Sequence, residues 1–283
     1  RRHRKNNAQQ TILIQHSQIN SMNSAIIYSS LDIAGSNACK QLRQEHEFKE
    51  NGEKTWEAHG VVLKEIGKPI IESDFLAGEL TDFDLIIFTS KHVSKEGKPA
   101  FTAHCTGNFG PAQYGGSDGE IALASAHAVK TAIDFFKENT LTGFDVTMEA
   151  THHGPTSLTV PCIFIEMGST EKQWSDKKAG GVLAECVWQV ARKWWWEKTG
   201  PAIAFGGGHY CPAFNELLDE YAFSHIAPKH AMEFVDEEMI KQMIEKTSEK
   251  PVSAVIDDKG IKSADKQIIV NWCEENDTQV EIV

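Results

Sequence analysis

The sequence has no apolar run that approaches the about 18 residues of a membrane-spanning helix. Apolar stretches such as 85–88 have the length of a β-strand, so we expect a soluble protein without a membrane partner. Basic residues are also scarce, since 28 Lys and Arg stand against 40 Asp and Glu, for a net charge of −12. Duplex DNA is bound through a broad basic face, so DNA is excluded as a partner, while a local basic groove is still allowed.

The six cysteines are widely spaced and include no C-x-x-C pair. This spacing argues against a disulfide framework and a cysteine-based zinc site, and it favours reduced thiols in the cytoplasm. The chain has no internal repeat or low-complexity linker, so we predict one domain over 22–283, with 47–80 as an insertion or an edge element. Residues 1–21 are basic and contain no acid. We predict a disordered extension there, with a transit peptide as the alternative.

Strand-like and helical segments alternate along the chain. The predicted strands are 25–28, 84–90, 100–106, 143–151, 161–167, 202–205, 252–256 and 279–282. The predicted helices are 33–46, 121–136 after a capping box of Ser117 and Glu120, a long helix from a capping box of Thr170 and Gln173 to Gly200-Pro201, 212–221, 236–248 and 263–274. This alternation predicts a layered α/β fold with a mixed, largely parallel sheet flanked by helices.

Several catalytic signatures are missing. The sequence has no G-x-S-x-G elbow, no H-E-x-x-H helix and no Walker loop, and its cysteines lack a local catalytic signature. These absences argue against the corresponding serine hydrolases, zincins and P-loop enzymes. Histidines, Glu149, Glu166 and a glycine-rich loop remain. That set suits hydrolysis by water, with or without a metal.

Two adjacent histidines, His152 and His153, follow the strand predicted at 143–151. Ligands of open α/β sheets bind where strands end. Neighbouring side chains of an extended chain point to opposite faces, so only one imidazole should face a pocket unless the turn at Gly154-Pro155 reorients them. A neutral imidazole there takes a proton from water or ligates a metal. The plainer interpretation is a turn with one solvated and one hydrogen-bonded histidine.

A glycine-rich loop follows the strand predicted at 202–205. Gly206, Gly207 and Gly208 let the backbone approach a ligand and adopt positive φ, and successive N–H groups then bind an oxyanion or a phosphate. His209 at the tip of the loop favours a functional role over a bare glycine turn.

Further polar residues follow the neighbouring predicted strands. Lys91 and His92 come after 84–90, and His104 lies within 100–106. If these strands are neighbours, His92 and His104 approach the same rim of the sheet. For His104, a satisfied position in the core is the alternative interpretation.

Together these motifs resemble the archaeal and plant type of D-aminoacyl-tRNA deacylase. The matching segments are T-S-K-H at 89–92, 99–108, Y-G-G at 114–116, E-A-T-H-H-G-P-T at 149–156, F-I-E-M-G-S-T-E at 164–171, G-G-G-H-Y at 206–210 and H-I-A-P-K at 225–229. The blocks at 149–155 and 206–210 are specific in combination. The sequence departs from the family at Cys211, where alanine is common, and it matches weakly over 47–80.

The resemblance implies hydrolysis of the ester between a D-amino acid and the 3′-CCA end of tRNA. It also implies zinc dependence and a fold similar to those of peptidyl-tRNA hydrolase and the phosphorylase/hydrolase-like proteins. Two alternatives are a metal-dependent amidohydrolase or peptidase on a related scaffold, and a non-catalytic protein that binds tRNA ends. We expect a cytoplasmic monomer.

The motifs give three sets of candidate site residues. The candidate catalytic residues are His152, His153 and His209. The candidate ligands of a zinc ion are His104, His152, His153, His209 and Glu166. The candidate substrate-binding residues are Gly206, Gly207, Gly208, Lys91, His92, Thr106, Asn108 and Glu149.

Overall fold

The protein contains two β-sheets, here described from a computed structural model that covers residues 22–251 and 253–283. The predicted extension 1–21 lies outside the described residues. The strands of the larger sheet are β1 (Ser24–Ser29), β2 (Lys49–Gly52), β3 (Thr55–Ala58), β4 (Val61–Ile66), β5 (Leu85–Val93), β6 (Ala100–His104), β7 (Asp145–Met148) and β8 (Cys162–Ser169). The strands of the smaller sheet are β9 (Gly200–Phe205), β10 (Tyr221–Ala227), β11 (Ser253–Ile256) and β12 (Gln279–Ile282).

The larger sheet has the order β2-β3-β4-β1-β5-β8-β6-β7 and the smaller one β10-β9-β11-β12. In the larger sheet, β4, β1, β5 and β8 are parallel, and β6 runs antiparallel to β8. All pairs in the smaller sheet are parallel. The predicted α/β fold with a mixed, largely parallel sheet is therefore confirmed, whereas the division into two sheets was not predicted.

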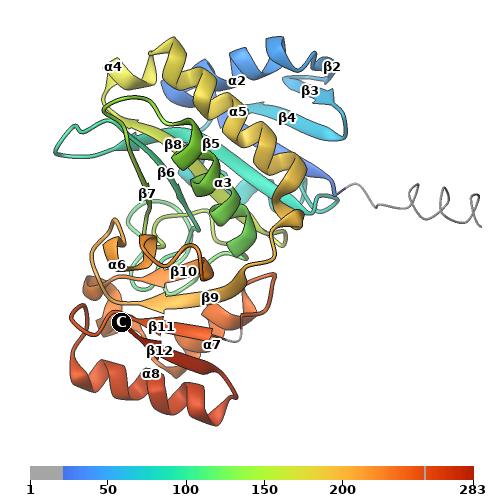
Figure 1. The fold of residues 1–283 in the computed structure, drawn as a ribbon. Coiled ribbons are helices and arrows are strands. Elements are labelled where there is room, and N and C mark those ends of the chain that lie inside the picture. The colour runs from blue at the N-terminus through green and yellow to red at the C-terminus, as the bar shows by residue number, and fades with distance from the viewer. Residues whose placement is uncertain (1–21, 252) are drawn as a thin grey trace, which may run out of the picture.

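Helices cover both sheets (Figure 1). They are α2 (Ile33–Glu45), α3 (Ala126–Asn139), α4 (Glu171–Trp174), α5 (Lys177–Lys193), α6 (Pro212–Asn215), α7 (Glu237–Glu245) and α8 (Ser263–Glu275). The 3₁₀ helices are η1 (Ile70–Leu76), η2 (Trp194–Trp196) and η3 (Lys229–Phe234). None of these helices is both long and apolar enough to cross a bilayer. Residues 47–80 form β2, β3, β4 and η1, so this region supplies one edge of the larger sheet.

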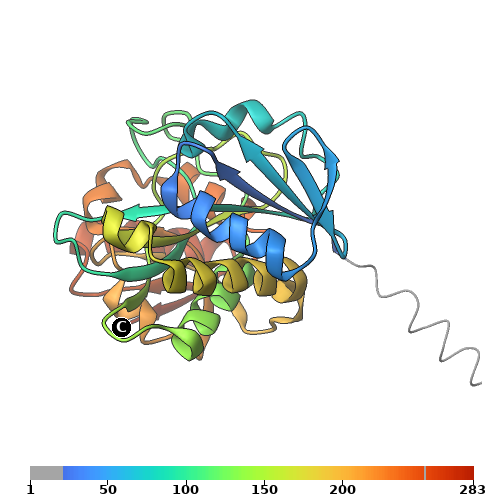
Figure 2. The same cartoon turned by 90° about the horizontal axis from the view of Figure 1, so that it is seen from above.

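Three apolar clusters hold the layers together. The largest lies between the larger sheet and α2, α3 and α5, which cross one of its faces (Figures 1 and 2), and it continues into β9 and β10. A second cluster packs Ile27, Phe88 and Phe164 against η1 on the opposite face. The third joins the smaller sheet to α7 and α8. The first cluster therefore fixes the two sheets to each other, and the loops at the sheet ends meet.

The helix predicted from a capping box at Ser117 and Glu120 begins later in the chain. α3 starts one residue after Ser125, whose side chain caps it. Ser117 and Glu120 lie in the preceding loop, in which Gly119 has a φ of +62°, a conformation foreign to a right-handed helix. The predicted capping box was wrong because a second cap, close to the apolar stripe, starts the helix.

The capping box of Thr170 and Gln173 is present, but it opens only the short α4. Asp176 accepts two backbone hydrogen bonds and starts α5 as a separate helix. α5 ends at Lys193 and η2 follows, well before Gly200-Pro201. The prediction of one continuous helix up to that dipeptide was therefore wrong.

No strand was predicted at β10, and the helix predicted at 212–221 is limited to α6. Ser224 and His225 interrupt the apolar run of β10 and hide it in the sequence. Both are buried in the structure because they find polar partners, Ser224 with Thr247 Oγ1 at 2.7 Å and His225 with Thr151 Oγ1 at 3.3 Å.

Gly35 allows α2 to pack closely on β5. A Cβ atom at this position would lie 2.4 Å from the backbone oxygen of Thr89. Gly35→Ala is expected to lower the free energy of unfolding by about 1–3 kcal/mol, since the helix must move off the sheet. Gly181→Ala in α5 is the matched control, because its Cβ would meet only Gln41 Oε1, at 3.4 Å. There alanine is expected to add about 0.5–1 kcal/mol by restricting the unfolded chain. Urea unfolding of both variants measures this, and equal effects would contradict the packing argument.

Candidate active site

A cleft of about 670 Å³ lies at the edge of the larger sheet where β1, β5 and β8 end. The apolar residues of its lining, together called the apolar wall, are Leu31, Pro69, Ile70, Ile71, Val93 and Tyr114. The polar residues of its lining are Ser29, Asp32, Ser90, Lys91, His92, Glu149, His152, His153, Glu166 and His209. The cleft therefore combines surface for an apolar group with a dense set of titratable side chains.

The chain turns sharply after β7, and this turn brings both members of the histidine doublet to the cleft. His153 has a φ of +45°, in the left-handed region, so the two residues are not extended. The Gly107 amide donates to the carbonyl of His153 at 2.8 Å. Gly154 permits the tight packing that follows, because a Cβ there would lie 2.3 Å from the amide nitrogen of Gly116. The turn thus reorients the doublet, and the limit of one imidazole per pocket does not apply.

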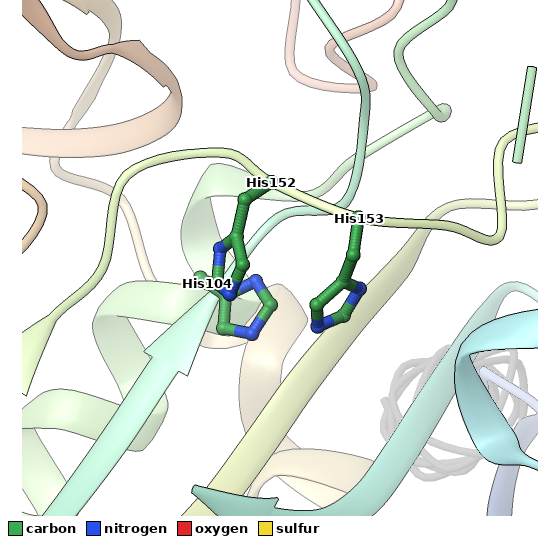
Figure 3. A group of neighbouring side chains, drawn as sticks. All are labelled: His104, His152 and His153. Atoms are coloured by element: carbon green, nitrogen blue, oxygen red, sulfur yellow. The ribbon is translucent and has the colours of Figure 1, made fainter. Parts of the chain in front are cut away.

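Three imidazoles gather here, those of His104, His152 and His153 (Figure 3). In each ring Nδ1 donates to a backbone carbonyl close in sequence, at distances of 3.2, 2.8 and 2.7 Å respectively. A carbonyl only accepts, so Nδ1 carries the proton and Nε2 keeps its lone pair. One ring nitrogen of each histidine lies within 4.8 Å of those of the other two.

All three rings are neutral. Burial, reinforced by the neighbouring histidines, lowers the pKa of each, from 6.5 to about 3. Nε2 of His104 is buried and has no hydrogen-bond partner in the described part of the chain. A buried, unpaired nitrogen lone pair is costly unless something binds it. Three neutral imidazoles, each oriented by a hydrogen bond from Nδ1, fit a zinc ion.

Glu149 connects the two sheets inside the cleft. Its side chain is 1% exposed, and its carboxylate lies 2.9 Å from His92 Nδ1 and 2.7 Å from His209 Nε2. Burial favours the neutral acid, but the hydrogen bonds from His209 and His92 outweigh burial and hold the pKa of Glu149 well below its usual range. The carboxylate is therefore charged at neutral pH.

Glu166 lies on β8 beside Ser90 of β5, and the Ser90 hydroxyl donates to it at 2.5 Å. Burial raises the pKa of Glu166 to about 6. His92 Nδ1 and His104 Nε2 lie 3.8 and 3.9 Å from its Oε2. Burial disfavours a charged His92, but Glu149 and Glu166 outweigh it and raise its pKa to about 11, so His92 is a cation.

Eight of the residues predicted from the sequence gather in or directly beneath this cleft. They are Lys91, His92, His104, Glu149, His152, His153, Glu166 and His209. Thr106 and Asn108 have internal partners instead, since Thr106 Oγ1 donates to Pro155 O and Asn108 Nδ2 to Gly115 O. Both support the loops around the histidine doublet. Gly206 follows β9, and Gly207 and Gly208 line a second cavity on the other side of the same loop.

Sequence reasoning missed four residues of this site. Asp32 and Ser90 follow or end buried strands, so their positions at strand ends were the available signal. Tyr114 belongs to the Y-G-G segment, and Tyr210 ends the G-G-G-H-Y segment. The Tyr210 hydroxyl lies 3.1 Å from His92 Nε2. These hydroxyl groups and the carboxyl group of Asp32 were not among the predicted site residues.

Comparison with known proteins assigns the chain to a family. A sequence profile of D-aminoacyl-tRNA deacylases matches residues 79–281, which include the histidine doublet and the glycine-rich loop. The chain belongs to this family. The resemblance seen in the sequence is thus confirmed, and no relative supports the two alternative functions.

Two relatives of the deacylase family match most of the chain. The D-aminoacyl-tRNA deacylase of Cenarchaeum symbiosum is 38% identical over 253 residues, which cover 88% of this chain and 95% of that protein. The one of Thermococcus kodakarensis is 35% identical over 255 residues, with 86% and 93% covered. A crystal structure described as a conserved protein of unknown function superposes with a TM-score of 0.86 at 29% identity, covering 92% and 95% of the two chains.

His225 makes the stability of this deacylase family member depend on pH. Burial lowers its pKa from 6.5 to about 4, so the unfolded state binds the proton more readily. The stabilisation that neutral His225 gives to the folded state is present above pH 6.5 and is lost as the pH falls toward 4. Between pH 7 and 5 this histidine should remove about 2 kcal/mol from the free energy of unfolding.

Urea unfolding of His225→Asn at the two pH values tests this, with the exposed His59→Asn as the control. The pH dependence of the free energy of unfolding should become smaller only in the His225 variant. Equal pH dependence in both variants would contradict the assignment.

Proposed function

We propose that this chain hydrolyses the ester bond of D-aminoacyl-tRNA and releases the free D-amino acid and tRNA. The observation that carries the proposal is the meeting of the two family segments, at 149–156 and 206–210, in one cleft that also holds His92, His104 and Glu166. An activated ester needs a positioned water, a proton acceptor and a group that stabilises the oxyanion. The cleft has candidates for each.

His104, His152 and His153 would hold a zinc ion through their Nε2 atoms. Their neutral state, their fixed tautomers and the unpaired Nε2 of His104 all support this assignment. Bound zinc supplies Lewis acidity, which makes a water more acidic and polarises an ester carbonyl. The same low pKa values, about 3, argue against these rings as general bases, because an effective base titrates near the working pH.

His209 suits the transfer of protons. Its side chain is 38% exposed, and Nε2 donates to Glu149 at 2.7 Å, which leaves the lone pair of Nδ1 free to accept a proton. In the proposed reaction, the water oxygen attacks the ester carbon while His209 accepts the water proton. The bond between the carbonyl carbon and the ribose oxygen then breaks, and His209 returns the proton to that oxygen. Glu149 positions His209 through the hydrogen bond that it accepts from Nε2.

The apolar wall suits the amino-acid side chain, with Ile70 and Ile71 inside the cleft and Tyr114 at 66% exposure. We propose that selection for the D-form works by exclusion, since a wall where an L side chain must point rejects it by collision. The partner is the single-stranded CCA end of tRNA. The monomeric state and the cytoplasmic location stay predictions.

The ratio of D- to L-aminoacyl-tRNA hydrolysis tests the proposed activity. We expect release of D-amino acids only, and a loss of about 10²–10⁴-fold in kcat for His209→Ala. His46→Ala is the matched control, because His46 also pairs with a glutamate, Glu185 at 3.0 Å, but on the outer helices. Radiolabelled aminoacyl-tRNA gives the rates. Equal rates on both enantiomers, or full activity of the His209 variant, would overturn the assignment.

Metal analysis of the purified chain tests the zinc site independently of activity. We expect bound Zn²⁺ in the wild type, a rise in melting temperature on adding Zn²⁺ to chelated protein, and a loss of affinity of at least about 10-fold for His153→Ala. The control is His46→Ala, because His46 belongs to a second group of possible ligands with Glu45 and Glu185. Zinc binding that depends on His46 and not on His153 would place the metal elsewhere.

A further inference from the structure

A second cavity of about 810 Å³ lies on the other side of the glycine-rich loop from the catalytic cleft. Its lining includes Gly207, Gly208, Lys229, His230, Ile261 and Lys262. These residues come from three separate loops, which follow β9, β10 and β11. The proposed hydrolysis uses none of them.

The topology of the smaller sheet creates this cavity. β9 lies between β10 and β11 (Figure 1), so the chain leaves β9 toward one side of the sheet and later continues on its other side. Because all four strands are parallel, the loops after β9, β10 and β11 lie at the same edge of the sheet, beside the switch point at β9. In open parallel sheets, the crevice at such a point, at the carboxyl ends of the strands, is where ligands bind.

Backbone contacts hold the three loops together without any ligand. The Lys229 amide donates to Gly207 O at 2.9 Å, and the Gly206 amide to Ala227 O at 2.8 Å. Gly260 packs so closely on this loop that a Cβ there would lie 2.2 Å from the amide nitrogen of Gly207. The cavity is therefore formed in advance, as expected of a binding site.

The lining of this cavity carries charges of both signs. Lys229 and Lys262 are exposed, and among residues 22–251 and 253–283 neither forms an ion pair within 4.0 Å. The carboxylates of Glu233 and Asp265 also border the cavity, but both line the next hollow along the surface as well. They therefore lie where the two hollows meet. Two free ammonium groups beside a glycine-lined backbone suit an anion.

We infer that this cavity binds a backbone phosphate of the single-stranded acceptor end of the tRNA, an inference that rests on the proposed function. Gly208 lines the cavity and the next residue, His209, lines the catalytic cleft, so the two sites share one wall. In aminoacyl-tRNA the ester sits on the ribose of the last nucleotide, and the first chain phosphate belongs to that same nucleotide. A chain with a net charge of −12 needs such local cations to hold RNA.

Replacing the two lysines by glutamine tests the inference. For Lys229→Gln combined with Lys262→Gln, we expect KM for a D-aminoacyl-tRNA to rise about 5- to 20-fold with kcat little changed. Each replacement should also reduce the slope of log Kd against log salt for uncharged tRNA by about 0.7. Lys259→Gln is the matched control, since Lys259 is on the same loop but lines a different hollow. In the double variant, the fold loss of kcat/KM for D-aminoacyl-tRNA should be at least five times any loss of kcat/KM for a D-amino acid methyl ester.

The outcomes separate this inference from the proposed function. An unchanged KM and salt slope in the double variant would overturn the inference while D-specific hydrolysis by the wild type stands. Lysine-dependent binding of inorganic phosphate without an effect on tRNA would overturn it too, because the cavity would then serve a free anion. A wild type that does not cleave D-aminoacyl-tRNA would overturn the proposed function, and the affinity for uncharged tRNA would still decide whether the cavity holds RNA.

Discussion

The buried charge of Glu149 is the constraint on which the rest of the site depends. Removing a carboxylate from water costs several kcal/mol unless it is paired and hydrogen-bonded. Here the partners come from different sheets, His92 from β5 and His209 from the loop after β9. The neighbouring backbone forms a seam between the sheets, since the Ala150 amide donates to His209 O. The cleft around Glu149 thus exists only where both sheets are assembled, and the charge of Glu149 is compensated across their interface.

Hydrogen-bond partners divide the imidazoles of the cleft into two kinds. His104, His152 and His153 donate to backbone carbonyls, which carry no charge to stabilise an imidazolium, so burial keeps these rings neutral. His92 is also buried but faces two carboxylates, which make it a cation. One residue type is therefore neutral at three positions and charged at a fourth a few ångströms away, and the groups around each ring set the difference.

The sequence carried enough information to predict the fold class, most strands and the residues that gather in the cleft, because strand ends in open α/β sheets converge. It did not reveal the φ of +45° at His153, by which two side chains that should diverge in an extended chain converge on one cleft. β10 was missed because Ser224 and His225 read as surface residues, while their polar partners come from distant segments. The second sheet was not predicted either, because the spacing of strands along the chain does not reveal which strands pair.

The glycine-rich loop shows how tertiary context changes the meaning of a motif. In the sequence it is a nest for an anion beside His209, whereas in the structure the loop separates two cavities and presents His209 to one and Gly207 and Gly208 to the other. Charges more than about 8 Å apart in water are largely screened at physiological salt. The excess of 12 negative charges therefore matters less to a phosphate in the cavity than Lys229 and Lys262 do. An acidic protein can in this way hold a polyanion at one point while the rest of its surface repels it, which restricts binding to a free single-stranded end.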